Sequence, residues 1–356
     1  MKKHNFSAGP SILPQEVIEK AAEAILNFNN SNLSLIEISH RSKDFVAVME
    51  NACNLVKELL NLPEGYSVLF LQGGASLEFL MTPYNLLKVG GKAGYVDTGA
   101  CSTAAIKEAK KLGTVEILAS SKEQGYNNIP KNYAIPTGLD YIHTTSNNTI
   151  FGTQLKDFPK SDSLLVCDMS SDIFSRVLDF TQFDLIYAGA QKNMGPAGAT
   201  LVVVKDEILG KSGREIPSML DYQVHIAKES MFNTPPVFAV YTSMLTLEWL
   251  KGLGGVAAIE KLNIAKAELL YTEIDRNPLF KGFAAKEDRS NMNVTFNLTD
   301  EATAPVFDKI WNAAGISGLK GHRSVGGYRA SIYNALPIES VQVLVDAMQQ
   351  FEKEIA

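Results

Sequence analysis

The spacing of apolar residues predicts two amphipathic helices near the N-terminus. Residues 15–28 repeat apolar side chains at helical spacing, and residues 43–62 do so more strongly. The apolar positions of the second segment are Phe45, Val48, Ala52, Leu55, Val56 and Leu59. Side chains three and four residues apart share one face of a helix, so we expect each segment to bury one face.

From Ser67 onward the pattern changes to short, nearly continuous apolar runs separated by helical segments. The runs are SVLFL (67–71), AGYVDTG (93–99), TVEILAS (114–120), LDYIHTT (139–145), SLLVCDM (163–169), DLIYAGA (184–190) and ATLVVVK (199–205). Such runs are typical of strands that are covered on both faces, as in a mostly parallel α/β sheet. We therefore predict an α/β fold with helices on both faces of this sheet.

The C-terminal part of the chain has a different pattern. Two helical stretches meet at the glycines of 252–255, which form the best candidate for a domain boundary. Beyond them, alternation in 291–298 and 328–334 and helical spacing in 303–315 and 339–355 indicate a smaller α+β unit.

The length of 356 residues favours two domains, although length alone also allows a single-domain barrel. We predict a large domain of residues 16–251. The small domain then consists of residues 1–15 and 252–356.

Composition excludes several classes of protein. The net charge of -6 and the lack of a Lys/Arg block argue against a broad nucleic-acid interface. No apolar stretch is long enough to span a bilayer, and the N-terminus lacks the apolar run of a signal peptide. Cys53, Cys101 and Cys167 form no close pair, and the five histidines are dispersed. We expect no metal site and a reducing compartment, the cytoplasm.

A glycine-rich turn in LFLQGGASLEFL (69–80) lies between a predicted strand and a predicted helix. Backbone N–H groups and the dipole of such a helix start favour an anion, so a phosphate is the expected ligand. A turn that uses glycines only for close packing explains the segment about as often, because it matches neither the Walker pattern nor the GxGxxG fingerprint.

An acid and an amine follow two later strands. Asp168 ends an apolar run at the edge where open α/β sheets bind ligands, and a carboxylate there can hold a proton on a heteroaromatic nitrogen. A helix N-cap explains it equally well. Lys192 lies among small residues in AGAQKNMGPAG, where partial burial favours Schiff-base chemistry over a solvated loop position. Together with the phosphate cradle, they form the minimal set for binding pyridoxal phosphate.

Four longer segments carry a family resemblance. They are AGAQKNMGPAG (188–198), MFNTPPVFAVY (231–241), EISHRSKDF (37–45) and LKGHRSVGGYRASIYNA (319–335). They closely resemble phosphoserine aminotransferases, which are class V, fold type I enzymes that depend on pyridoxal phosphate. The resemblance runs from FSAGP near the N-terminus almost to the C-terminus. It implies a fold type I transferase with a mostly parallel seven-stranded sheet.

The resemblance also implies roles for individual residues around the cofactor. Lys192 would form the Schiff base and then move protons between substrate and cofactor. Asp168 would keep the pyridine nitrogen protonated, and Thr149 would contact the phenolic side of the ring. The residues implied for the cofactor phosphate are Ala75, Ser76 and Gln191, together with Asn233 and Thr234 of a partner subunit. Active sites shared in this way imply a homodimer.

The substrate phosphoserine carries a carboxylate and a phosphate, so cations are needed at two places. Arg329 matches the family's carboxylate-binding arginine, whose planar fork suits bidentate contact. His40 with Arg41, and His322 with Arg323, match the family's phosphate-binding pairs. Each His-Arg pair alone would more often be an ordinary surface feature. The same pocket is expected to accept the side-chain carboxylate of glutamate.

Two positions depart from the family pattern. Cys101 stands where relatives commonly carry a tryptophan that stacks on the cofactor ring, in the predicted loop after the strand that ends at Gly99. A missing aromatic contact is worth roughly 0.5 to 1.5 kcal/mol, which predicts weaker cofactor retention. Ser76 stands where some relatives have an arginine that assists the substrate phosphate, which leaves that role to the two His-Arg pairs.

The resemblance implies reversible amino transfer between phosphoserine with 2-oxoglutarate and 3-phosphohydroxypyruvate with glutamate. 4-Phosphohydroxythreonine is an expected second substrate, which would link the enzyme to serine and pyridoxine biosynthesis. One alternative is another class V enzyme, such as an alanine-glyoxylate type aminotransferase or a cysteine desulfurase. A desulfurase needs a reactive cysteine late in the chain, and none follows Cys167. Another alternative is a non-catalytic protein that binds pyridoxal phosphate.

Overall fold

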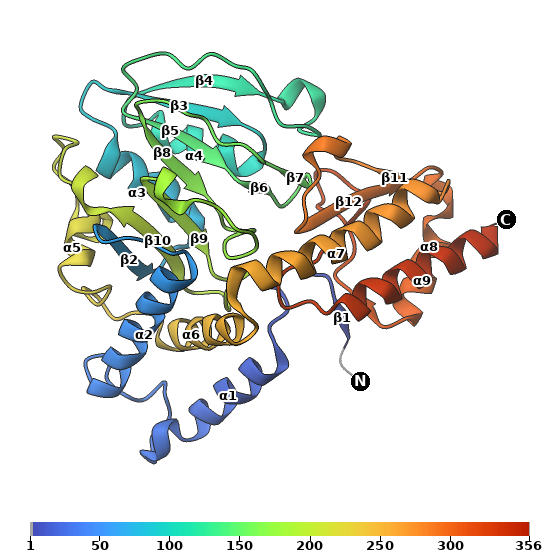
Figure 1. Cartoon of the computed structure of the whole chain (residues 1–356), viewed down its shortest axis with the longest axis horizontal. Coiled ribbons are helices and arrows are strands. Elements are labelled where there is room, and N and C mark those ends of the chain that lie inside the picture. Colours follow the sequence, from blue (N-terminus) through green and yellow to red (C-terminus); the bar gives the residue numbers. More distant parts are fainter. Residues whose placement is uncertain (1–2, 356) are drawn as a thin grey trace.

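A seven-stranded sheet is the framework of the computed structural model, which describes residues 3–355 (Figure 1). The spatial order of its strands is β2-β10-β9-β8-β5-β3-β4. Their bounds are β2 (Tyr66–Leu71), β3 (Lys92–Asp97), β4 (Thr114–Ser120), β5 (Tyr141–Thr145), β8 (Leu164–Asp168), β9 (Leu185–Gly189) and β10 (Thr200–Lys205). Only β10 runs antiparallel to its neighbours within this sheet. The predicted mostly parallel sheet is confirmed, because each apolar run forms one of its strands.

Helices cover both faces of this sheet, as the apolar runs predicted. One face packs on α1 (Gln15–Leu26), α2 (Lys43–Leu59) and α6 (Val237–Gly252). The other face packs on α3 (Gly74–Leu86) and α4 (Ala100–Ala109), with α5 (Tyr222–Ile226) beside them. Neighbouring strand residues alternate between the two cores: Phe70 faces α2, whereas Leu69 and Leu71 face α3.

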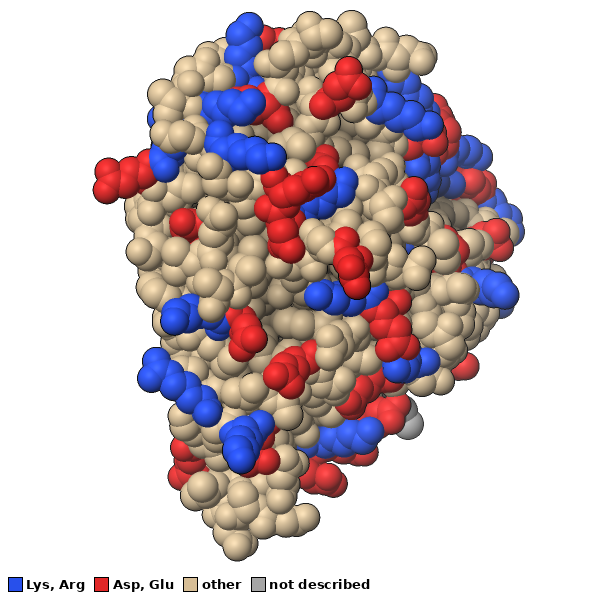
Figure 2. Space-filling model, turned by 60° about the vertical axis from the view of Figure 1, so that its left-hand side comes forward, with Lys and Arg blue, Asp and Glu red and all other residues tan. Residues whose placement is uncertain are grey.

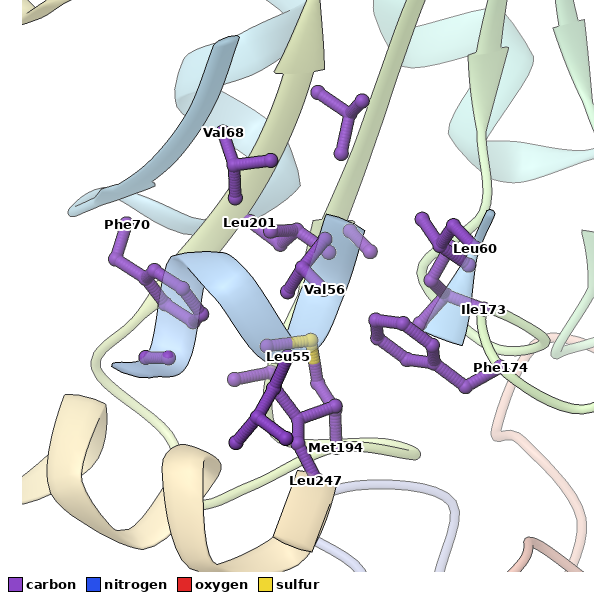
Figure 3. Packing of buried hydrophobic residues seen from close by; sticks show 14 of the residues in the cluster. Leu55, Val56, Leu60, Val68, Phe70, Ile173, Phe174, Met194, Leu201 and Leu247 are labelled. Carbon is purple, nitrogen blue, oxygen red and sulfur yellow. The ribbon is translucent and has the colours of Figure 1, made fainter. Parts of the chain in front are cut away.

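The packing of α2 shows why its residues form a helix. Ser42 caps its N-terminus by accepting a hydrogen bond from the backbone N–H of Phe45 at 3.4 Å. Figure 3 shows Leu55 and Val56 of α2 between Val68 and Phe70 of the sheet and Leu247 of α6. The predicted apolar stripe of this helix is therefore buried.

A further hydrophobic core, separate from the two that flank the seven-stranded sheet, lies around a three-stranded antiparallel sheet in the order β11-β12-β14. Its elements are β11 (Phe280–Gly282), β12 (Asn293–Leu298), β14 (Tyr328–Ser331), α7 (Gly255–Arg276), α8 (Ala304–Ala313) and α9 (Ile338–Ile355). Near the N-terminus, β1 (His4–Asn5) pairs with β13 (Ile316–Ser317), and Phe6 joins this core. The α+β character expected of the C-terminal part is present. The division into domains of residues 16–251 and of 1–15 with 252–356 stays a prediction; residues 1, 2 and 356 lie outside the described part.

Short elements connect the larger ones. A hairpin of β6 (Asn147–Asn148) and β7 (Thr153–Gln154) follows β5. The 3₁₀ helices are η1 (Phe28–Asn30), η2 (Lys122–Gln124), η3 (Phe180–Gln182), η4 (Asp206–Ile208), η5 (Ser218–Leu220), η6 (Lys286–Asp288) and η7 (Glu301–Thr303).

Charge is distributed unevenly over the surface. Acidic and basic side chains are interspersed over most of the face in Figure 2, whereas the lowest tip, near the end of α1 and η1, is largely uncharged. Leu26, the last residue of α1, is 81% exposed. Ile36 is 63% exposed and follows Leu35, whose N–H donates to the Ala24 carbonyl of α1. Within residues 3–355, the helices are all too short or too polar to cross a bilayer.

Candidate active site

Lys192 lies in the tight turn after β9, at the carboxyl end of the sheet. Its side chain is half-buried, and its Nζ donates a hydrogen bond to Thr149 Oγ1 at 3.0 Å. The N-terminal segment fixes the backbone of this turn. The Ser11 hydroxyl donates to the carbonyl of Lys192, and the Ser11 N–H donates to the carbonyl of Gln191 at 2.9 Å. The amine therefore projects from a backbone that is held on both sides.

Asp168 ends β8, beside Lys192, and is 2% exposed. Ser170 donates two hydrogen bonds to Asp168 Oδ1, from its N–H at 2.9 Å and its hydroxyl at 2.6 Å. Burial raises the pKa of Asp168, while the charge of Lys192 and the Ser170 bonds lower it. In the described chain no residue hydrogen-bonds to Oδ2. The acid thus caps a turn rather than an α-helix, and one oxygen is left to accept a bond from a ligand.

Thr149 links the amine to Arg329 on β14. Arg329 Nη1 donates to the Thr149 carbonyl at 3.3 Å, while the Thr149 hydroxyl accepts from Lys192. Burial lowers the pKa of Arg329, and its Nε is buried with no partner among residues 3–355. A half-buried guanidinium with an unused donor is suited to bind a carboxylate. His322 lines the same small cavity as Arg329, and its Nδ1 pairs with Ser324 Oγ at 2.7 Å.

In the described residues, no hydrogen bond or ion pair joins the two predicted phosphate-binding pairs. His322 and Arg323 are exposed in the loop before β14. His40 and Arg41 precede α2, where His40 is half-buried and Arg41 is exposed. Within residues 3–355, no hydrogen bond or ion pair joins either His40 or Arg41 to Lys192. The phosphate-binding role of both pairs stays a prediction.

The glycine-rich turn precedes α3 as predicted. Gly73 and Gly74 have φ of 91° and 65°, a left-handed conformation that glycine adopts without strain. Because α3 begins at Gly74, Ala75 and Ser76 lie in its first turn, where backbone N–H groups lack intrahelical partners. An anion bound at this helix start would meet free donors.

Asn233 and Thr234 lie next to this turn in the same chain. Gln72 Nε2 donates to the Thr234 carbonyl at 2.6 Å, and Asn233 Nδ2 donates to Gln72 Oε1 at 3.3 Å. The Gln191 side chain folds over Gly189, where an added Cβ would lie 2.7 Å from Gln191 Oε1. The phosphate-binding roles of these residues, across a subunit boundary for Asn233 and Thr234, stay predictions.

The predicted loop position of Cys101 is wrong, because the residue lies in the first turn of α4. The strand ends at Asp97, and the helix begins at Ala100. The Ser102 hydroxyl accepts from the N–H of Gly99 at 3.0 Å and starts the helix at once. Burial raises the pKa of the Cys101 thiol, which Lys192 lowers and Asp168 raises. The charges of the acid and the amine therefore both act on Cys101, and its contact with the ring stays a prediction.

Residues outside the predicted set also build this site. Tyr333 is buried, donates from Oη to the Ala8 carbonyl at 2.7 Å and accepts from Asn293 Nδ2 at 3.2 Å. An added Cβ at Gly9 would lie 3.3 Å from Lys192 Cγ, so this backbone passes close to the amine. Both stretches belong to motifs that carried the resemblance, FSAGP and YRASIYN. The resemblance of these two motifs to the family was the signal that could have identified Tyr333 and Gly9.

These residues fit pyridoxal phosphate. The open oxygen of Asp168 can hold a protonated ring nitrogen, Lys192 supplies an amine, and the start of α3 offers donors for a phosphate. Among residues 3–355, no group of three or more His, Cys, Asp or Glu side chains is arranged to hold a metal ion.

Comparison with known proteins agrees with this geometry. The family model for class-V aminotransferases matches residues 3–344. A phosphoserine aminotransferase of Flavobacterium psychrophilum is 70% identical over 356 residues and covers 100% of both chains. A solved phosphoserine aminotransferase from Bacillus circulans subsp. alkalophilus has a TM-score of 0.97 and 43% identity, over 100% of this chain and 99% of its own.

A further solved structure is described as a phosphoserine aminotransferase from Trichomonas vaginalis with pyridoxal phosphate bound. It has a TM-score of 0.92 and 35% identity, over 98% of this chain and 100% of its own. These matches span nearly the whole of each protein. The chain belongs to the class-V aminotransferases and, within them, to the phosphoserine aminotransferases.

Proposed function

We propose that the chain is a transaminase that converts phosphoserine and 2-oxoglutarate reversibly to 3-phosphohydroxypyruvate and glutamate, with pyridoxal phosphate as cofactor. The observation that carries the proposal is the continuous contact from Lys192 through Thr149 to Arg329, with Asp168 buried beside it. It places an amine, an acid and a carboxylate-binding guanidinium in one site. Family membership supports the same reaction.

Each residue has a defined task in this proposal. Pyridoxal phosphate supplies an aldehyde and an electron-poor ring that stabilises negative charge on the substrate carbon. Asp168 Oδ2 accepts a hydrogen bond from the protonated ring nitrogen and keeps that proton in place. Lys192 Nζ moves a proton at the substrate carbon. Arg329 binds the carboxylate common to the amino donor and the amino acceptor through its planar fork.

The substrate phosphate requires cations beyond Arg329, and the proposal assigns these to His40, Arg41, His322 and Arg323. A homodimer would complete the site, with Asn233 and Thr234 reaching the cofactor phosphate of the partner subunit. Exposed Leu26 and Ile36 near the uncharged tip support a contact with another chain, because single-chain proteins rarely expose such patches without a function. Light scattering that gives a monomer at assay concentration would reject the dimer.

Three finer assignments belong to the same proposal. The three cysteines are free, which supports a reducing location, the cytoplasm. 4-Phosphohydroxythreonine is proposed as a second substrate in pyridoxine biosynthesis, because it presents the same carboxylate and phosphate. A division into domains of residues 16–251 and of 1–15 with 252–356 is proposed, because the core around the three-stranded sheet draws on Phe6 and on residues from Ala267 onward.

The test supplies the purified protein and pyridoxal phosphate with 2-oxoglutarate and one amino donor at a time. Glutamate formation from phosphoserine is expected, with little formation from serine, which lacks the phosphate. Alanine with glyoxylate is the matched control for the rival class V reaction. Preferential turnover of alanine, or binding of the cofactor without turnover of any donor, would reject the proposal.

A further inference from the structure

A buried lysine on α7 holds the turn that follows β14. Lys266 is 1% exposed, and its Nζ donates to the carbonyls of Ile332 at 3.0 Å, Tyr333 at 2.7 Å and Leu336 at 3.2 Å. An ammonium group has three donors, and here they meet three acceptors. No carboxylate in residues 3–355 forms an ion pair with it.

This arrangement is costly for a residue that only fills space. Burial lowers the pKa of Lys266 to about 7, which reflects the penalty for a charge away from water. An apolar side chain would pack here without that penalty. The hydrogen bonds to three carbonyls instead fix the path of the backbone from Ile332 to Leu336.

The turn of residues 332–336 contacts both halves of the active site. It begins three residues after Arg329, and its Asn334 N–H donates to Asn193 Oδ1 at 2.9 Å. Asn193 is the neighbour of Lys192 in the chain. On α7, Asn263 lies one helical turn before Lys266, is 1% exposed and donates to Asn334 Oδ1 at 2.8 Å. One face of α7 therefore holds a turn that joins the guanidinium to the amine.

We propose that Lys266 and Asn263 are positioning residues that hold the turn of residues 332–336, so that Arg329 and Lys192 keep a fixed separation. The inference rests on the proposed function, in which Arg329 binds the substrate carboxylate and Lys192 supplies the amine. It goes further by placing the control of that geometry on α7, away from the reacting atoms.

The first test measures steady-state kinetics of the loaded enzyme with Lys266→Met. We expect KM for phosphoserine and for 2-oxoglutarate to rise together, each by roughly tenfold, because both carry the carboxylate that a displaced Arg329 would bind less well. kcat should change less. Lys261→Met, an exposed site on the same helix, is the matched control and should leave both constants unchanged. Unchanged KM values in a folded Lys266→Met enzyme would overturn the proposal.

The second test does not depend on turnover. Hydrogen exchange of the loaded protein should become faster in Lys266→Met both in residues 332–336 and in the turn around Asn193. Faster exchange confined to α7 would show a purely local packing role and overturn the proposal. If phosphoserine is not a substrate, this result still decides the positioning role, so the two failures are distinguishable.

A milder variant covers the case in which Lys266→Met fails to fold. Asn263→Ala removes the bonds to Asn334 and to the Ser175 carbonyl and leaves Lys266 in place. It should raise both KM values in the same direction, by a smaller factor, and speed exchange around Asn193. If Asn263→Ala matches the unsubstituted enzyme in both measurements, the proposal fails.

Discussion

The two ends of the candidate site are built differently. At the cofactor end, Asp168 is 2% exposed and receives two hydrogen bonds, while Lys192 is bonded to Thr149. At the proposed phosphate end, Arg41 and Arg323 are exposed cations. The first end is preorganised by the sheet and its turns, whereas the second depends on loops.

This difference indicates how each end works. Buried, hydrogen-bonded groups hold their orientation before substrate arrives, so changes there should reduce the rate of the chemical step. Exposed cations act through screened charge, so changes there should affect affinity and its dependence on salt. Substitutions at the cofactor end therefore test this comparison most sharply.

The largest effect is expected for Asp168→Asn, which keeps the shape of the side chain but removes its charge. Without the carboxylate the ring nitrogen loses its proton partner, and kcat should fall by roughly 10² to 10⁴-fold. Steady-state kinetics with saturating cofactor measures this effect. Asp162→Asn, at an exposed position before β8, is the control. A fall of less than about fivefold would contradict the role of Asp168, because a positioned proton partner is worth far more.

A smaller effect is expected for Arg329→Lys, which keeps the charge but loses the planar fork. Hydrogen bonds to charged groups are worth about 1.5 to 3 kcal/mol, so KM should rise roughly 10- to 100-fold. The rise should appear for phosphoserine and 2-oxoglutarate alike, because each carries the carboxylate. A rise for only one of them would place Arg329 at the phosphate end instead.

The free energy of unfolding should also depend on pH, because α3 carries a buried carboxyl at Glu78. This carboxyl is 0% exposed, accepts from Tyr222 Oη at 2.6 Å, and burial raises its pKa to about 8. The folded state therefore binds a proton that the unfolded state loses above pH 4.5. The free energy of unfolding should fall as pH rises from 4.5 to about 8, by roughly 1.4 kcal/mol per unit of pKa difference.

Denaturant unfolding across this pH range measures the fall. Glu78→Gln removes the titrating group and should flatten the profile relative to the unsubstituted protein. Glu64→Gln, at an exposed site, should leave the profile unchanged. Equal pH slopes for Glu78→Gln and the unsubstituted protein would show that this carboxyl is not held protonated.

The smallest effect is expected for Cys101→Trp. An aromatic side chain facing the ring should tighten cofactor binding by roughly 0.5 to 1.5 kcal/mol. Because Cys101 lies in the first turn of α4 and not in a loop, the tryptophan must fit beside a rigid helix start. Fluorescence titration of the cofactor-free protein measures the affinity, and equal affinities would contradict the expected stacking.

The sequence predicted those features that depend on residues close to one another in the chain. Continuous apolar runs such as SLLVCDM identified the strands, because a strand covered on both faces requires them. Asp168 at a strand end and Lys192 among small residues were recognisable for the same reason. The start of α4 was missed because it depends on the Ser102 hydroxyl capping Gly99, which apolar spacing does not reveal.

Long-range contacts were beyond the reach of the sequence pattern. The bonds from Ser11 to Lys192, from Tyr333 to Ala8 and from Lys266 to the turn after β14 join segments hundreds or tens of residues apart. Their partners are backbone carbonyls, which every residue has, so no residue type marks them. Only the folded chain brings these groups together.

The most direct test of the amine and the buried acid is the visible absorbance of the purified protein with pyridoxal phosphate, before and after phosphoserine is added. We predict a yellow band that shifts on addition of phosphoserine, and a loss of that shift in Lys192→Ala at the same cofactor concentration. Protein that gains no band with the cofactor, or a Lys192→Ala variant that turns over phosphoserine as fast as the unsubstituted enzyme, would contradict the account.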